Sequence, residues 1–381
     1  MLALAPLAAA GDDTAVTVQW QGEKLRWNGE ELTGAELPGE LGEAPREAIA
    51  AWAGWAGEHG YRMALSDDGR VLLILDGKQR SVAKPLKLIE RTGAYVDELL
   101  PAPERSNAPP IQHEGQHEGQ HAGQHAGGSA AAQDASWTTW SNDGPALDTA
   151  TAVLVQAKNP ADYGLALDHI AAVHDYLRGW IADGKRMAGF VLQRPLVGAW
   201  LEEGPGLEEW DPENELVNRL AQLLVLRRFG QQPFWLTMGI AWHVEHELRG
   251  SIYCFPYRSG FVFASEHDAW ERDLRQAFKK TKEVDLDELR AWRRGTYQPD
   301  LARRAWGCVG FLARNRPAAL APILEELRML RDEDGVVHHQ DGTWERVVDF
   351  QIPAENQLAA FEKHAGEDFL EELLRFYRQG R

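Results

Sequence analysis

The chain has few cysteines, a deficit of basic residues and no long apolar run. Only Cys254 and Cys308 occur in 381 residues, which excludes a disulfide-dense framework and leaves their pairing open. There are 40 basic and 58 acidic residues, for a formal net charge of −18. This argues against a nucleic-acid partner, which requires clustered Lys and Arg. No segment reaches the about 18 uninterrupted apolar residues of a transmembrane helix.

Residues 1–10, MLALAPLAAA, form a short apolar run that ends in small residues. This is typical of the last part of a signal peptide with its cleavage site, although the basic leader is missing. We therefore interpret residues 1–13 as a signal-peptide remnant and expect an extracytoplasmic protein, secreted or periplasmic. The alternative is a disordered N-terminus.

The length indicates two domains. Residues 14–104 read as a small α+β domain. Residues 105–135 contain His113, His117, His121 and His125 in tetrapeptide repeats and few large apolar residues, which predicts a disordered His/Gly-rich linker. Residues 136–381 form the second domain. The expected elements are helices near 45–60, 84–100 and 160–182, strands at 61–65, 70–75, 151–156 and 188–192, and a hairpin around 338–342.

Two adjacent helices carry the features that bear on function. Asp211-Pro212-Glu213 is a helix start, with Asp as N-cap and Pro at the first helical position. The helix continues through Asn214-Glu-Leu-Val-Asn218, and Gly230 with Pro233 ends it. A second helix is predicted from Phe234 to about Leu248.

This pair resembles the gluzincin superfamily of zinc metallopeptidases, of the peptidase MA-like, thermolysin or aminopeptidase type. The segment Pro233-Phe-Trp235-Leu-Thr-Met238-Gly-Ile-Ala241 is similar to the family's Pro-x-Trp-Leu-x-Glu-Gly-Leu-Ala, whose Glu is a zinc ligand. Asn214-Glu215-Leu-Val-Asn218 stands at the place of His-Glu-x-x-His. Residues 305–312 and 361–369 resemble later family segments, so the likeness covers roughly 151–381.

The resemblance implies a degenerate metal site. Asn214, Asn218 and Met238 would take the ligand positions, and Glu215 would be a vestigial general base. Amide oxygens are weak donors and a thioether is too soft for Zn²⁺, so we expect no bound metal and no cofactor, although the family uses zinc. At about 100° per residue, His243 points about 140° and His246 about 80° away from Met238. Glu245 shares the face of Met238 but lies about 10 Å further along the helix, so these groups and Glu247 do not converge on the old site. Trp235, Trp242 and Glu245 are candidates to line the old cleft.

We therefore expect an α+β fold, with a small N-terminal α+β domain and a larger gluzincin-like domain whose C-terminal half is rich in helix. The expected function is that of an inactive peptidase homologue, a binding or scaffold protein that holds a peptide or protein partner in the vestigial cleft. Two alternatives stay open: an active metallopeptidase with atypical ligands, and a structural surface protein.

Overall fold

The computed structural model describes residues 25–27, 30–32, 41–78, 81–101, 149–202, 211–252, 269–280, 286–292, 298–330, 336–338, 344–346 and 352–379. The strands are β1 (Leu25–Trp27), β2 (Glu30–Leu32), β3 (Tyr61–Leu65), β4 (Val71–Asp76), β5 (Ala152–Ala157), β6 (Gly189–Leu192), β7 (Val197–Leu201), β8 (Val336–His338) and β9 (Trp344–Arg346). The helices are α1 (Glu43–His59), α2 (Ala83–Leu99), α3 (Pro160–Val173), the 3₁₀ helix η2 (Asp175–Leu177), α4 (Arg178–Gly184), α5 (Pro212–Phe229), α6 (Phe234–Arg249), α7 (Trp270–Lys280), α8 (Asp287–Arg290), α9 (Pro299–Asn315), α10 (Leu320–Met329), α11 (Ala354–Ala365) and α12 (Phe369–Gln379).

A mixed sheet of seven strands in the order β2-β1-β3-β4-β5-β7-β6 joins the two halves of the chain. Strand β4 pairs in parallel with β5, with Leu72 opposite Val153. Strand β5 pairs in parallel with β7, and β7 pairs antiparallel with β6. The boundary predicted between residues 104 and 136 therefore does not separate two folded domains. In the described residues both segments belong to one sheet, because β4 is hydrogen-bonded directly to β5.

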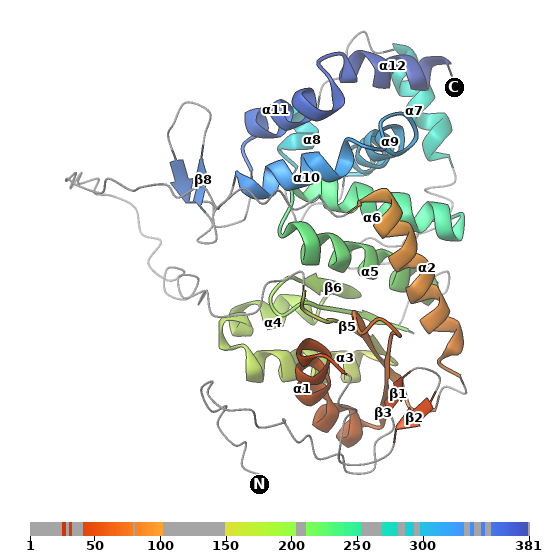
Figure 1. Cartoon of the computed structure of the whole chain (residues 1–381), viewed down its shortest axis with the longest axis vertical. Helices are drawn as coiled ribbons and strands as arrows, with labels where there is room; N and C mark the ends of the chain where they lie inside the picture. The colour runs from red at the N-terminus through yellow and green to blue at the C-terminus, as the bar shows by residue number, and fades with distance from the viewer. Residues whose placement is uncertain are drawn as a thin grey trace, which may run out of the picture.

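The central strands are buried on both faces, so they read as continuous apolar runs. Successive side chains of a strand point to opposite faces. Accordingly Leu73 of β4 packs with α2 and α5, whereas Leu72 packs with α1 and α3. Figure 1 shows these layers, with α1, α3 and α4 on one side of the sheet and α2 and α5 on the other. The remaining helices lie beyond α5 and α6, which confirms an α+β fold with a helix-rich C-terminal half.

Local sequence signals place most helix ends correctly. Gly60 and Gly250 end α1 and α6 in the left-handed conformation that glycine adopts without strain. The expected helix over residues 160–182 is wrong in one respect: it breaks at His174, and η2 and α4 follow. The predicted C-terminal hairpin is confirmed by the antiparallel pairing of β8 with β9.

Helix α6 packs closely against α9 through a glycine of the Pro-x-Trp-Leu segment. A Cβ atom on Gly239 would lie 2.7 Å from the backbone oxygen of Ala305. Since real Cβ atoms do not approach an oxygen so closely, any larger residue would force the helices apart. The glycine is therefore explained by helix packing, whatever the ancestry of the segment.

Several sequence predictions fall on other parts of the chain. The signal-peptide remnant, the His-rich linker and Cys254 lie outside the described residues. Cys308 is a buried free cysteine of α9, and burial raises the pKa of its thiol. Among the helices that the structure describes, none combines the length and the apolarity needed to cross a bilayer.

Candidate functional site

The first turn of α5 is fixed by its N-cap. The Asp211 carboxylate accepts hydrogen bonds from the backbone N–H groups of Glu213, at 2.8 Å, and Asn214, at 3.4 Å. Pro212 occupies the first helical position, where no N–H donor is needed. The helix that follows therefore begins in the register predicted from the sequence, and it carries Asn214, Glu215 and Asn218 in its first two turns.

Asn214 and Asn218 converge on one carboxylate of α6. Residues four apart lie on the same face of a helix, and here that face is turned toward α6. Asn214 Nδ2 donates to Glu245 Oε1 at 2.8 Å, and Asn218 Nδ2 donates to Glu245 Oε2 at 2.8 Å. All three side chains have no exposed surface. The two amides thus clamp both oxygens of a buried carboxylate.

Further hydrogen bonds fix the orientation of both amides. Gln222 Nε2 donates to Asn218 Oδ1 at 2.6 Å, and Arg249 Nε donates to Asn214 Oδ1 at 3.0 Å. Because each Oδ1 accepts from a neighbouring donor, each Nδ2 must face Glu245. Arg249 also contacts the Asp211 carboxylate at 2.9 Å. The polar groups form a continuous line from the N-cap of α5 to its third turn.

Glu215 faces another direction. One residue advances a helix by about 100°, so Glu215 turns away from the Asn face and toward the sheet. Its Oε2 accepts from Arg219 Nε at 3.0 Å and lies 2.8 Å from Nη2, with both side chains fully buried. The guanidinium rests on β6, where a Cβ atom on Gly189 would lie 2.7 Å from Arg219 Nη2. Glu215 is therefore held in an internal ion pair on another face of α5 from Asn214 and Asn218.

Met238 does not take the third position that the resemblance implied. Helix α5 continues from Asn218 to Phe229, roughly three turns, before the chain reverses into α6. The residue of α6 that returns to the level of Asn218 is therefore Glu245, and Met238 lies about 10 Å earlier along the helix. Met238 is a core residue with 1% of its surface exposed. The sequence placed Glu245 on the face of Met238 but could not show which of the two meets the Asn pair.

The cleft-lining residues proposed from the sequence are instead core residues. Trp235 is fully buried, and its Nε1 donates to Gln357 Oε1 at 2.8 Å. Trp242 packs edge-on against Trp270, with ring centroids 5.7 Å apart. Glu245, the third candidate, has no exposed surface. These three side chains contribute to packing between α6 and its neighbours, and a ligand in solution does not reach them.

The donor set does not fit a zinc ion. Zinc requires lone pairs directed at one point, but the two amides present N–H groups to the carboxylate, whose oxygens accept them. No group of three or more His, Cys, Asp or Glu side chains able to hold a metal ion occurs in the part of the chain that the structure describes. The site is therefore a buried hydrogen-bonded network, with donors matched to acceptors.

The histidines of α6 do not join this network. His243 Nε2 is hydrogen-bonded to the Tyr95 hydroxyl of α2 at 3.1 Å, and burial lowers the pKa of His243 to about 4. His246 packs edge-on against Trp306, with centroids 5.3 Å apart. Both rings lie on other faces of α6 from Glu245, as the helical period predicts, so they offer no replacement ligands.

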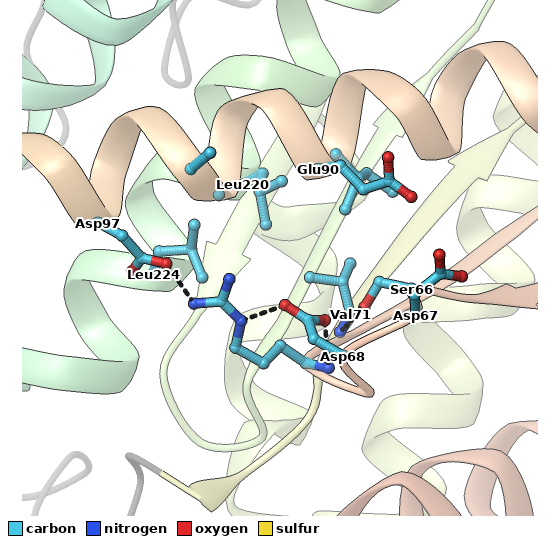
Figure 2. A pocket seen from close by; sticks show the side chains of 12 residues that line it. Ser66, Asp67, Asp68, Val71, Glu90, Asp97, Leu220 and Leu224 are labelled. Carbon is cyan, nitrogen blue, oxygen red and sulfur yellow. Dashed lines mark hydrogen bonds and ion pairs between the residues drawn. The ribbon is translucent and has the colours of Figure 1, made fainter. Parts of the chain in front are cut away.

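In the part of the chain that the structure describes, two pockets lie against α2, and the smaller has a volume of about 250 Å³. In Figure 2, Asp68 and Asp97 lie at this pocket together with Leu220 and Leu224 of α5. Arg70 Nε lies 2.5 Å from Asp68 and Nη1 lies 2.8 Å from Asp97. Burial alone would raise the pKa of Asp68, but hydrogen bonds from Ser66 and Arg70 lower it below its usual value. The charged groups of this pocket are thus largely engaged with one another.

The larger pocket has a volume of about 440 Å³ and lies beside the network. It is bounded by the first half of α2, the N-terminus of α5, the end of α6 and the ends of β5 and β7. Its lining includes Arg249, which also belongs to the network, and Gln156 of β5. Sequence reasoning missed this pocket, because it depends on the parallel pairing of β4 with β5 across a long stretch of chain.

Comparison with protein-family models and with curated proteins finds no match to this chain. The likeness to gluzincins therefore rests on the segments quoted from the sequence, which are the two helices and residues 305–312 and 361–369. Of these residues, Asn214 and Asn218 come together in space, and they do so with Glu245.

Proposed function

We propose that the chain is a non-catalytic binding protein of gluzincin-like ancestry that acts outside the cytoplasm. The observation that carries the proposal is that the residues of α5 at the family's ligand and general-base positions are bound to other side chains of this protein. The amides at the family's ligand positions are bonded to Glu245, and Glu215 is paired with Arg219. A general base must reach a water molecule that attacks the substrate. A fully buried carboxylate in an ion pair cannot do so.

The burial of the network also argues for a structural use of these residues. Opening it to admit a metal would leave buried amide N–H groups without acceptors, which costs about 1–3 kcal/mol for each group. Two amide–carboxylate bonds and the Arg249 contacts instead tie α5 to α6. These helices form the wall of the larger pocket, so the network supports a rigid surface on which a partner can bind.

Metal content and peptide hydrolysis test the proposal. The full chain with His113, His117, His121 and His125 all changed to Gln removes the confounding repeats. We expect less than a tenth of an equivalent of zinc by elemental analysis, as an order-of-magnitude limit, and no cleavage of a quenched fluorescent peptide mixture. Stoichiometric zinc together with hydrolysis that Glu215→Gln abolishes would refute the proposal and favour an active enzyme with atypical ligands.

A further inference from the structure

The larger pocket contains a buried amide that has no hydrogen-bond partner among the described residues. Gln156 lies on the face of β5 that otherwise presents Ala152 and Leu154 to the core. It is only 6% exposed, and it lines the pocket. Buried polar side chains are nearly always hydrogen-bonded. The amide of Gln156 opens onto the pocket without a protein partner, so it can serve a ligand with complementary donors and acceptors.

Some cationic side chains around the pocket form ion pairs, and others form none with the described residues. Lys84 is paired with Glu213, and Arg249 contacts Glu213 at 2.6 Å. Lys87 and Arg91, four residues apart on the same face of α2, form no ion pair with the residues that the structure describes. A pair of cations at this spacing suits a carboxylate, because a guanidinium can hold both oxygens.

The other residues that line the pocket favour a peptide over a ligand with several negative charges. Glu202, at the end of β7, lies on the wall together with Glu213, and both would repel a ligand with several negative charges. Leu88 and Leu216 add apolar surface. A volume of about 440 Å³ falls within the roughly 300–1,000 Å³ range of small-ligand sites. These features fit one carboxylate, an adjacent amide and a medium-sized apolar side chain.

We propose that this pocket binds the C-terminal end of an extended peptide. Lys87 and Arg91 bind the terminal carboxylate, Gln156 bonds to the preceding peptide group, and Leu88 with Leu216 contact the last side chain. This inference rests on the proposed binding function and names its ligand class. No bond is made or broken in the complex.

Fluorescence anisotropy with a labelled pentapeptide, Gly-Ala-Leu-Ala-Leu, tests the inference on the full-length chain. The peptide is used with a free C-terminus and as its C-terminal amide. We expect the free acid to bind about tenfold more tightly or better, because charge-assisted hydrogen bonds to the carboxylate are lost in the amide. Arg91→Gln and Gln156→Leu should each weaken binding of the acid about tenfold.

Lys279→Gln is the matched control, since Lys279 is an exposed cation of α7 that does not line the pocket. It should leave the affinity unchanged, and the unfolding midpoint of each variant checks that it is folded. Equal binding of acid and amide, unaffected by Gln156→Leu, would overturn the inference and leave the binding function standing. Absence of binding at millimolar peptide would also overturn it, without bearing on the metal and hydrolysis test. Cleavage of the peptide would instead overturn the proposed function.

Discussion

Replacement of Glu245 by alanine tests whether the buried network holds α5 to α6. Among the described residues, Glu245 is the only acceptor of Asn218 Nδ2, and the substitution also removes one acceptor of Asn214 Nδ2, which keeps the Ser251 oxygen at 3.0 Å. Hydrogen bonds to a charged group contribute about 1.5–3 kcal/mol each, and an orphaned buried donor costs about 1–3 kcal/mol. We therefore expect the unfolding free energy to fall by about 3–5 kcal/mol. This is a large part of the roughly 5–15 kcal/mol typical of folded proteins.

Glu247→Ala is the control on the same helix, because Glu247 is 34% exposed and its contact with Arg314 is 3.4 Å long. A surface pair of this kind contributes at most about 1 kcal/mol. Urea unfolding followed by tryptophan fluorescence measures both variants, and an unchanged slope with denaturant shows that both unfold over the same surface. If Glu245→Ala lowers the unfolding free energy no more than Glu247→Ala does, the network does not stabilise the packing of α5 against α6, and the structural role proposed for Asn214 and Asn218 is wrong.

Three further predictions follow from particular contacts. Gly239→Ala should destabilise the protein by about 1–3 kcal/mol through overpacking against α9. Gly54 of α1 has open space around it, so Gly54→Ala should stabilise the protein by about 0.5–1 kcal/mol. Thermal unfolding midpoints that shift in the same direction in both variants would contradict this prediction. The pKa of His243 in the folded protein is about 4, below its value in the unfolded chain. The contribution of neutral His243 to the unfolding free energy is therefore complete above about pH 6.5, and about 3 kcal/mol is lost as the pH falls toward 4. This loss should be smaller in His243→Gln, and parallel profiles of stability against pH for the two proteins would exclude the effect. The double variant Asn214→His with Asn218→His should bind one zinc ion with Glu245 as the third ligand, and adding Glu245→Gln should abolish the binding. If zinc binding instead requires Met238→Glu, then Met238 holds the third ligand position, as the resemblance implied.

Local signals in the sequence predicted the elements but not how they meet. Asp211 and Pro212 define the start of α5 because capping depends on a few adjacent residues. The pairing of β4 with β5 could not be predicted in this way, since it joins strands separated by a helix and a long low-complexity segment. Strand β7 was missed because Val197-Gly-Ala-Trp-Leu201 is a short run without alternation, which periodicity cannot distinguish from a buried helix segment.

The site shows the same division between local and long-range information. The helical period correctly predicted that Asn214 and Asn218 share one face of α5 and that His243 points away from the face of α6 that carries Glu245, because angles within one helix follow from residue number. The choice between Met238 and Glu245 depends on how far α5 runs before the chain reverses. The motif match fixed the start of α6, but not its alignment with α5, so the third member of the cluster was assigned about two turns too early.

The arrangement on α5 explains how a helix can carry Asn214, Glu215, Asn218, Arg219 and Gln222 and still be buried on every side. Adjacent i,i+4 pairs lie about 100° apart, so the amide pair meets Glu245 of α6 while the Glu215–Arg219 pair meets the sheet. Each of these side chains has at least one polar partner inside the protein, which offsets part of the penalty for burying it. Gln156 has no hydrogen-bond partner among the residues that the structure describes and lines the larger pocket beside this helix, so it is well placed to contact a ligand there.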